Sequence, residues 1–250
     1  MLEIKNLKVE IIDKTIIDGL NLTINDGEIH YLMGPNGVGK STIAKVLMHQ
    51  DDYKVSNGTI KYNGTDLNSL TTDEIARLGI SMVSQAPIEV EGVTNAEMLR
   101  MALSSRTDEQ VNIFKFNKEL EQVCEKLGVP KSFIHRNINE GMSGGERKKG
   151  ELVHIWMLKP NFLILDEIDS GLDIDSLKIV ANSLKEYKET YNASMLIITH
   201  NSKMLEILKP DYIHILDNKK IVKTGNIELL NLLEKSGFEA FKVSEIKNHE

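Results

Sequence analysis

The stretch GPNGVGKS, Gly34–Ser41, decides the fold of this 250-residue chain. It follows the apolar run EIHYLM, which predicts a strand, and it precedes TIAKVLMH, where apolar residues recur at helical spacing. The pattern G-x-x-x-x-G-K-[S/T] between a strand and a helix is typical of a phosphate-binding loop. Glycines let such a loop turn with positive φ, so that backbone amides and the helix N-terminus face the phosphate oxygens.

We therefore expect this loop to hold a nucleotide. Lys40 would reach the β- and γ-phosphates, and the hydroxyl of Ser41 would bind Mg²⁺. The residues expected to contact the nucleotide are Gly34, Pro35, Asn36, Gly37, Val38, Gly39, Lys40, Ser41 and Thr42. The alternative is an ordinary corner between a strand and a helix.

The run FLILDE, residues 162–167, predicts a buried strand that ends in two carboxylates. We expect Asp166 to hold Mg²⁺, directly or through water, and Glu167 to polarise the attacking water. Two carboxylates at a strand end can also form a solvated turn. That alternative is weakened here because the glycine loop already supplies a triphosphate and a metal for them to serve.

Two more polar residues follow predicted strands. His200 comes after SMLIIT, and Gln85 ends GISMVS. Side chains at the carboxyl ends of parallel strands point into the crevice where ligands bind. We expect His200 to hold the γ-phosphate and the water, and Gln85 to contact Mg²⁺ or water. A structural role at the strand end is the alternative for both residues.

Buried apolar runs alternate with helical patterns and predict an α/β fold with a parallel sheet covered on both faces. The first third of the chain is rich in strands, and a hairpin is expected around Asp217–Lys220. The segment 86–155 has a helical pattern, with no strand expected between Gln85 and residue 162. We interpret it as a helical insertion into the α/β body.

The composition excludes several classes of function. A net charge of −7 argues against nucleic-acid binding, which needs a basic surface. The basic run ERKKGE, residues 146–151, is expected to be a solvated helix face. Cys124, the only cysteine, cannot form an intramolecular disulfide, which suits a reducing compartment, and we expect it in a core. No apolar stretch is long enough to span a membrane, so a cytoplasmic location is expected.

These pieces together resemble the ATP-binding-cassette (ABC) ATPases over nearly the whole chain. GPNGVGKS matches the Walker A motif, and FLILDE matches the Walker B motif. Gln85 matches the Q-loop, and His200 matches the H-loop. SGLD at Ser170–Asp173 matches the D-loop, and MSGGE at Met142–Glu146 matches the family signature. The resemblance implies Mg²⁺-dependent hydrolysis of ATP to ADP and phosphate.

The resemblance also implies the architecture. Residues 1–250 would form one P-loop NTPase domain of the ABC-ATPase fold. Segments 1–85 and 156–250 would form the core with its mixed, mainly parallel sheet and an antiparallel β subdomain, and 86–155 the helical subdomain with the signature. Two copies would pair transiently, head to tail, around two ATP molecules. Ser143, Gly144 and Gly145 of one copy would then close over the γ-phosphate held by the other.

The adenine site departs from the family pattern. Many members stack adenine on an aromatic residue in the second strand region. The nearest positions in this sequence are Ile11 and Ile12, and no aromatic residue is available there. We therefore expect an apolar and weaker contact with the base.

The wording of two motifs narrows the resemblance. The transporter signature typically has Gln after SGG. This chain has Glu146 at that position, and Arg147, Lys148 and Lys149 follow it. This run and DEIDSGLDIDSLK, residues 166–178, resemble the Suf-type iron–sulfur assembly ATPases. That resemblance implies a SufB-like scaffold as partner, with or without a SufD-like subunit. The alternatives are a motor subunit of an ABC membrane transporter and a soluble translation or DNA-repair cassette, which usually carries two cassettes or a long coiled coil.

The partner surface is expected in the helical insertion. Met-rich helices make adaptable interfaces, and NAEMLRMAL supplies Met98, Leu99, Met101 and Leu103 as candidates. The alternative is that these four residues form the core of the insertion itself.

Overall fold

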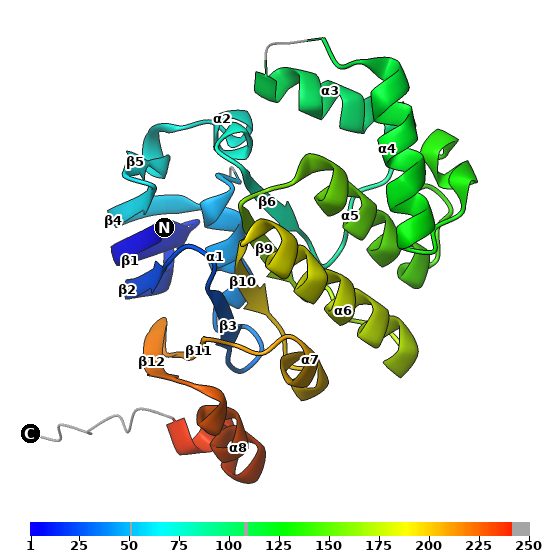
Figure 1. The fold of residues 1–250 in the computed structure, drawn as a ribbon. Coiled ribbons are helices and arrows are strands. Elements are labelled where there is room, and N and C mark those ends of the chain that lie inside the picture. The colour runs from blue at the N-terminus through cyan, green and yellow to red at the C-terminus, as the bar shows by residue number, and fades with distance from the viewer. Residues whose placement is uncertain (51, 108–109, 242–250) are drawn as a thin grey trace, which may run out of the picture.

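A computed structural model describes residues 1–50, 52–107 and 110–241 of the chain (Figure 1). Its strands are β1 (Leu2–Ile11), β2 (Lys14–Ile24), β3 (Ile29–Met33), β4 (Lys54–Tyr62), β5 (Thr65–Asp66), β6 (Ile80–Val83), β7 (Val90–Thr94), β8 (Asn137–Ile138), β9 (Phe162–Asp166), β10 (Ser194–Ile198), β11 (Tyr212–Asp217) and β12 (Lys220–Gly225). Its α-helices are α1 (Lys40–Leu47), α2 (Thr72–Arg77), α3 (Asn95–Thr107), α4 (Ile113–Lys126), α5 (Gly144–Leu158), α6 (Ile174–Tyr191), α7 (Ser202–Ile207) and α8 (Ile227–Ser236). Single turns of 3₁₀ helix lie at Leu67–Ser69, Lys131–His135 and Phe238–Phe241.

The central sheet has six strands in the order β12-β11-β3-β10-β9-β6. Its inner strands are parallel, and only β12 pairs antiparallel, with β11. The strands β3, β9 and β10 are buried at every residue, as continuous apolar runs in a covered parallel sheet should be. Because β3, β10, β9 and β6 are neighbours and parallel, the segments that follow them all emerge at one edge of the sheet.

Side chains alternate between the two faces of this sheet and form two separate cores. On one face, Tyr31 of β3 and Leu165 of β9 pack with residues of α5, α6 and α7. On the other face, Leu32 of β3 and Ile164 of β9 pack with α1 and with β1, β2 and β4. The predicted α/β fold with a sheet covered on both faces is confirmed.

A second, four-stranded sheet has the order β2-β1-β4-β5 and is antiparallel throughout. It lies on the far side of α1 from the central sheet (Figure 1). Its alternating residues, such as Leu2, Ile4 and Leu22, point into the core shared with α1. This sheet is the antiparallel β part that the family resemblance implies.

Residues 86–155 contain α3, α4 and most of α5, which lie together on one side of the body (Figure 1). Two details differ from the sequence prediction. The strands β7 and β8 pair within this segment, where no strand was expected, and α5 continues past residue 155 to Leu158. Cys124 is fully buried in the helical core, as predicted. In the described ranges, none of the helices has the length and apolar content needed to cross a bilayer.

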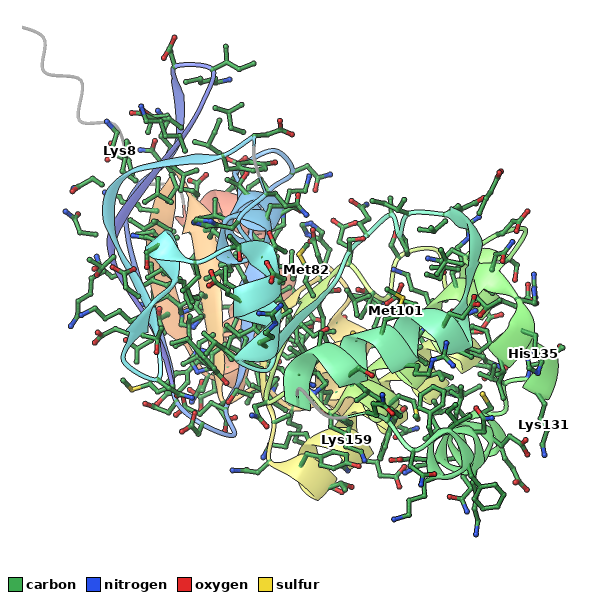
Figure 2. All side chains as sticks on the ribbon, turned by 90° about the horizontal axis from the view of Figure 1, so that it is seen from above. Lys8, Met82, Met101, Lys131, His135 and Lys159 are labelled. Atoms are coloured by element: carbon green, nitrogen blue, oxygen red, sulfur yellow. The ribbon has the colours of Figure 1, made fainter. Side chains whose placement is uncertain are left out.

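Four candidate partner contacts on α3 divide between core and surface. Leu99 is fully buried, and Met98 and Leu103 pack partly buried against the core. Only Met101 is well exposed, at 68%, and it lies on the outer side of α3 (Figure 2). Leu99 is therefore a core residue, and the expectation that it forms part of a partner surface was wrong.

Candidate active site

The phosphate loop needs glycine for reasons internal to this chain. Gly34 has φ 155°, and a Cβ added there would lie 2.2 Å from the carbonyl oxygen of Leu216. Gly39 has φ 105°, and its Cβ would lie 2.9 Å from the side chain of Ile17. Gly39 also precedes α1, so the helix N-terminus opens onto the loop.

The side chain of Lys40 is fixed by hydrogen bonds to the backbone of the phosphate loop. Its Nζ donates to the carbonyl oxygens of Gly34 and Pro35, both at 2.9 Å, and the residue is only 6% exposed. Desolvation lowers the pKa of Lys40, and the negative charges of Glu167 and Asp166 oppose that shift. The ammonium group is therefore fixed near two carboxylates and close to where phosphates would lie.

Ser41 and Asp166 meet as the Mg²⁺ prediction requires. The hydroxyl of Ser41 donates to Oδ1 of Asp166 at 3.1 Å. Burial raises the pKa of Asp166, and the hydrogen bond from Ser41 partly opposes that shift. A buried carboxylate beside a hydroxyl oxygen suits Mg²⁺, which prefers oxygen ligands and one or two carboxylates together with substrate phosphates. The residues present therefore fit this ion.

Glu167 and Gln85 are in direct contact. Nε2 of Gln85 donates to Oε2 of Glu167 at 2.5 Å. Glu167 adopts φ 49°, an uncommon backbone conformation for a residue with a side chain, and its N–H donates to the carbonyl of Ile198 at 2.9 Å. Such strained residues persist where the surrounding structure holds them, often at functional sites.

His200 shares an open cavity with Glu167, Asp169 and Ser170. Partial desolvation and the positive charge of Lys40 lower the pKa of His200. The imidazole is therefore mainly neutral at pH 7, with one ring nitrogen able to accept and the other to donate a hydrogen bond.

A larger cavity of about 480 Å³ opens over the phosphate loop. It falls within the usual range of small-molecule sites. It is lined by Ile11, Ile16, Asn36, Gly37, Gly39, Lys40, Ser41, Thr42, Tyr53, Gln85 and Glu167. The structure thus brings six of the nine predicted phosphate-loop residues, Gln85 and Glu167 to one cavity, whereas Gly34, Pro35, Val38 and Asp166 do not line it. Glu167 also lines the cavity of His200.

The structure adds an aromatic residue to those expected at the adenine site. Ile11 does line the cavity, but Ile12 is 95% exposed in the turn after β1 and is not among the lining residues. An aromatic residue is present, because Tyr53 lies between α1 and β4 and lines the same cavity. Sequence reasoning missed Tyr53 because it searched only the strand region before the loop.

The signature residues lie elsewhere in the chain. Ser143 caps α5, and Gly144 and Gly145 begin that helix. None of the three is among the residues that line the cavity over the phosphate loop. A Cβ added to either glycine would meet no atom within 4 Å, whereas one at Gly150 would lie 2.8 Å from the ring of Phe133. Packing within this chain explains glycine at position 150 and does not explain it at positions 144 and 145.

One residue of the basic run departs from the sequence interpretation. Lys148, in the basic run expected to be solvated, is only 5% exposed, and its Nζ has no hydrogen-bond partner among the described residues. Desolvation lowers the pKa of Lys148, and nearby acids, Glu151 first, oppose that shift. Asp173, in the D-loop match, caps α6 by accepting from the N–H of Ser176 at 2.7 Å.

Fold and site define a P-loop protein whose central sheet carries the Walker A and Walker B residues after β3 and at the end of β9, two parallel strands separated by β10. The family model described as "ABC transporter" matches residues 17–170. The chain therefore belongs to the ATP-binding-cassette family of ATPases. Membership of this family implies ATP binding and hydrolysis.

Three relatives cover almost all of the chain. It is 42% identical over 243 residues to the probable ATP-dependent transporter ycf16 of Cyanophora paradoxa, with 96% of this chain and 93% of the relative covered. It is 41% identical over 245 residues to the probable ATP-dependent transporter SufC of Escherichia coli, with 95% of this chain and 97% of the relative covered. It is 42% identical over 247 residues to the iron–sulfur cluster assembly protein SufC of Plasmodium falciparum, with 96% of this chain and 71% of the relative covered.

Solved structures share the fold. A dimeric post-hydrolysis state of the ATP-binding cassette MJ0796, bound to ADP and Pi, superposes with a TM-score of 0.79 at 19% identity and covers 91% of this chain and 99% of its own. A nucleotide-free cassette from an ABC transporter superposes with a TM-score of 0.78 at 22% identity, covering 98% and 99%. These likenesses support the ABC fold.

Proposed function

We propose that this chain is the ATP-hydrolysing subunit of a cytosolic iron–sulfur cluster assembly complex. The relatives named SufC, at 41% and 42% identity over nearly the whole chain, support this role. In the proposal, two copies pair head to tail on ATP and remodel a SufB-like scaffold, with or without a SufD-like subunit. Hydrolysis then releases the pair.

The observation that carries the pairing is the separation of the signature from the phosphate loop. A Cβ added to Gly144 or Gly145 would meet no atom within 4 Å, and neither glycine lines the nucleotide cavity. Small residues with open space in front of them suit close approach by an external group. We assign that group as the γ-phosphate of ATP held by the second copy, received by Ser143 and by the N-terminus of α5. One copy alone would leave the transition state half-stabilised.

The residues of the cavity divide the chemistry among them. Lys40 and the loop amides bind the phosphates, and Ser41 and Asp166 would hold Mg²⁺, which supplies positive charge to the phosphate oxygens. Glu167, oriented by Gln85, orients the water that attacks the γ-phosphorus. The bond between the γ-phosphorus and the oxygen that bridges the β- and γ-phosphates breaks, that oxygen stays on ADP, and the oxygen and both protons of the water leave as dihydrogen phosphate. His200 would hold the γ-phosphate and the water.

We place the scaffold contact on the exposed apolar residues of segment 86–155, which we propose works as a helical subdomain. Met101 of α3 and Ile113 of α4 line one open groove, and Phe114 beside them is 80% exposed. Contiguous exposed apolar patches on a soluble protein often mark interaction sites. Replacing Met101 or Phe114 with Glu should therefore reduce copurification with the scaffold and leave ATP binding unchanged.

Two experiments test the proposal. Gel filtration of Glu167→Gln with ATP and Mg²⁺ should show a stable dimer, because binding remains while hydrolysis stops; Lys40→Ala should stay monomeric because it loses the nucleotide. A Glu167→Gln protein that remains monomeric at saturating ATP overturns the pairing. Copurification from the native cell should recover a SufB-like protein, and recovery of a polytopic membrane protein alone would favour the transporter alternative.

A further inference from the structure

The signature helix α5 begins with a carboxylate at the place where it should receive an anion. Oε2 of Glu146 accepts hydrogen bonds from the N–H of Ser143 at 2.9 Å and from its hydroxyl at 2.8 Å. The N–H of Glu146 in turn donates to Oγ of Ser143 at 3.4 Å. This reciprocal arrangement is a capping box. The backbone hydrogen bond from Ser143, ahead of the other causes, lowers the pKa of Glu146, so the side chain is charged at neutral pH.

That charge has a consequence for the proposed dimer. The partial positive charge at a helix N-terminus attracts anions, and a carboxylate in the first turn already satisfies part of it. Glu146 therefore opposes the approach of a γ-phosphate to Ser143. A glutamine at this position would form the same capping box without the negative charge.

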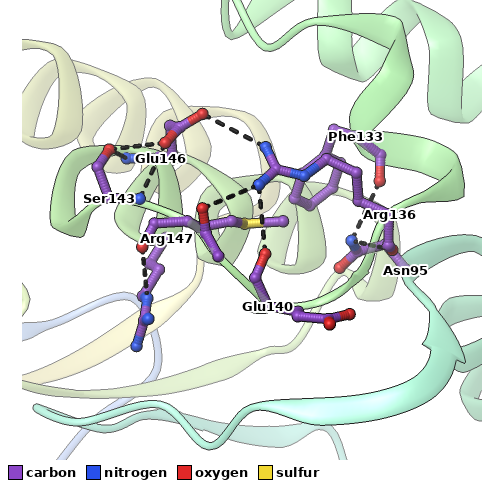
Figure 3. A network of polar contacts seen from close by, with 9 residues as sticks. Asn95, Phe133, Arg136, Glu140, Ser143, Glu146 and Arg147 are labelled. Carbon is purple, nitrogen blue, oxygen red and sulfur yellow. Dashed lines mark hydrogen bonds and ion pairs between the residues drawn. The ribbon is translucent and has the colours of Figure 1, made fainter.

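Arg136 lies beside this carboxylate. Its Nη1 is 3.4 Å from Oε1 of Glu146, and its Nη2 donates to the carbonyl oxygens of Glu140 and Gly141, both at 3.2 Å (Figure 3). The guanidinium therefore contacts both the carboxylate of the capping box and the backbone that leads into Ser143.

A buried residue holds the backbone of Arg136 in place. The side-chain amide of Asn95, at the start of α3, donates to the carbonyl oxygens of Arg136 at 2.9 Å and of Phe133 at 3.1 Å (Figure 3). Asn95 is only 1% exposed, and its Oδ1 lies 2.9 Å from Nε2 of His154 on α5. The backbone that carries Arg136 is thus fixed, although the side chains of Arg136 and Glu146 are 38% and 52% exposed.

We propose that Arg136 sets the affinity of the signature loop for the γ-phosphate of a second copy by offsetting the charge of Glu146. The inference rests on the head-to-tail pairing of the proposed function. Arg136 acts through Glu146, so it is a positioning residue and not a catalytic one. Because a head-to-tail dimer contains two signature loops, a change in this pair acts twice on its dissociation constant.

Sedimentation of the Glu167→Gln protein with Mg²⁺ and ATP measures that constant directly. In this background, Glu146→Gln should tighten the dimer and Arg136→Gln should weaken it. A single charge at a helix terminus changes an equilibrium by about two- to fivefold, so two loops give about four- to twenty-five-fold per dimer. Arg136→Lys keeps the charge and should stay near the parent. All these differences should shrink at 1 M salt, where the Debye length is about 3 Å.

The double variant separates this inference from its alternatives. Once Glu146 is Gln, adding Arg136→Gln should change the dissociation constant little, because Arg136 then has no charge to offset. An unchanged loss in the double variant would overturn the inference. Glu140→Gln is the matched control, because it removes the same charge from a side chain that contacts Asn137 instead of Ser143, and its effect should be smaller. If the parent itself forms no dimer with ATP, the proposed function fails; if it dimerises and Glu146→Gln has no effect, only the present inference fails.

Discussion

Ser41 and Asp166 stand 125 positions apart in the sequence, yet the hydroxyl of Ser41 donates to Oδ1 of Asp166 at 3.1 Å. The contact joins the first residues of α1, which follows β3, to the carboxyl end of β9. It depends on the strand order β3-β10-β9, which brings both segments to one edge of the sheet. The proposed metal site therefore depends on topology as much as on the two motifs.

Asp166→Asn should raise the thermal stability of the nucleotide-free chain and remove its ability to bind Mg²⁺ with ATP. Burial raises the pKa of Asp166, so the folded state is penalised for holding the carboxylate charged at neutral pH. An amide keeps an acceptor for Ser41 without that penalty. We expect the Tm without nucleotide to rise by about 2–4 °C, the shift that 1 kcal/mol makes in a protein of this size. The additional rise that Mg²⁺ gives to the ATP-bound protein should disappear. Thermal scans with and without Mg²⁺ test both statements, and an unchanged Mg²⁺ effect would contradict the assignment.

Gly145→Ala should block pairing without harming the fold. The added methyl group meets no atom within 4 Å, and alanine suits a helix better than glycine by up to about 1 kcal/mol. The Tm should stay level or rise, while the dimer of the Glu167→Gln background is lost on gel filtration because the methyl group fills the space meant for the second copy's nucleotide.

Gly150→Ala, in the same helix, is the matched control. Its methyl group would lie 2.8 Å from the ring of Phe133, and such overpacking costs about 1–3 kcal/mol. The Tm should fall, but the protein that remains folded should still dimerise with ATP. Retained dimerisation in Gly145→Ala would show that the open space at the signature serves another purpose.

Tyr53→Ala should weaken ATP binding, and Tyr53→Phe should not. Tyr53 is the aromatic residue that lines the cavity over the phosphate loop, next to Ile11 and Ile16. An aromatic contact with adenine is worth about 0.5–1.5 kcal/mol, which is about two- to twelvefold in affinity. Titration with ATP and with the bare triphosphate distinguishes a base contact from a general disturbance. Equal losses for both ligands would show that Tyr53 supports the loop rather than the base.

The fold and the positions of the candidate site residues at one edge of the sheet were predictable because they rest on local signals. Continuous apolar runs identified β3, β9 and β10, and the glycine loop identified the turn between β3 and α1. Fully buried parallel strands admit few other sequences, and a loop that approaches phosphate admits few other residues. The polar residues at the strand ends followed from the same topology.

The missed features depend on contacts that no local pattern reports. Tyr53 reaches the cavity because the chain returns past α1 before β4 begins. Lys148 is buried because its turn of α5 faces the core, although the surrounding run is charged. The short strands β7 and β8 exist because each supplies the other's hydrogen bonds, over a separation of more than forty residues. In each case, contacts between segments distant in the sequence determine the structure, and local composition does not.

A buried histidine pair joins β3 to the neighbouring strand β11. Nδ1 of His30 and Nε2 of His214 are 2.8 Å apart, and each residue is at most 5% exposed. Nε2 of His30 lies 2.9 Å from the carboxylate of Glu28, and Nδ1 of His214 lies 2.8 Å from the hydroxyl of Thr224. One proton arrangement satisfies all three contacts: His30 donates to Glu28, His214 donates to His30, and Thr224 donates to His214. Both rings are neutral in that arrangement.

This pair should make the protein sensitive to acid. Burial lowers the pKa of His214 to about 3, and burial also lowers the pKa of His30, although Glu28 opposes that shift. The unfolded chain titrates near pH 6.5, so it binds more protons than the folded chain below that pH. Stability is therefore full above about pH 6.5 and is lost as the pH falls toward 3, with a slope of up to about 1.4 kcal/mol per pH unit for each histidine. Urea unfolding between pH 7 and pH 4 should show His214→Gln losing less stability per pH unit than the parent, whatever its absolute stability. The same replacement at the exposed His135 is the control, and parallel slopes for His214→Gln and the parent would show that the buried pair does not control the acid response.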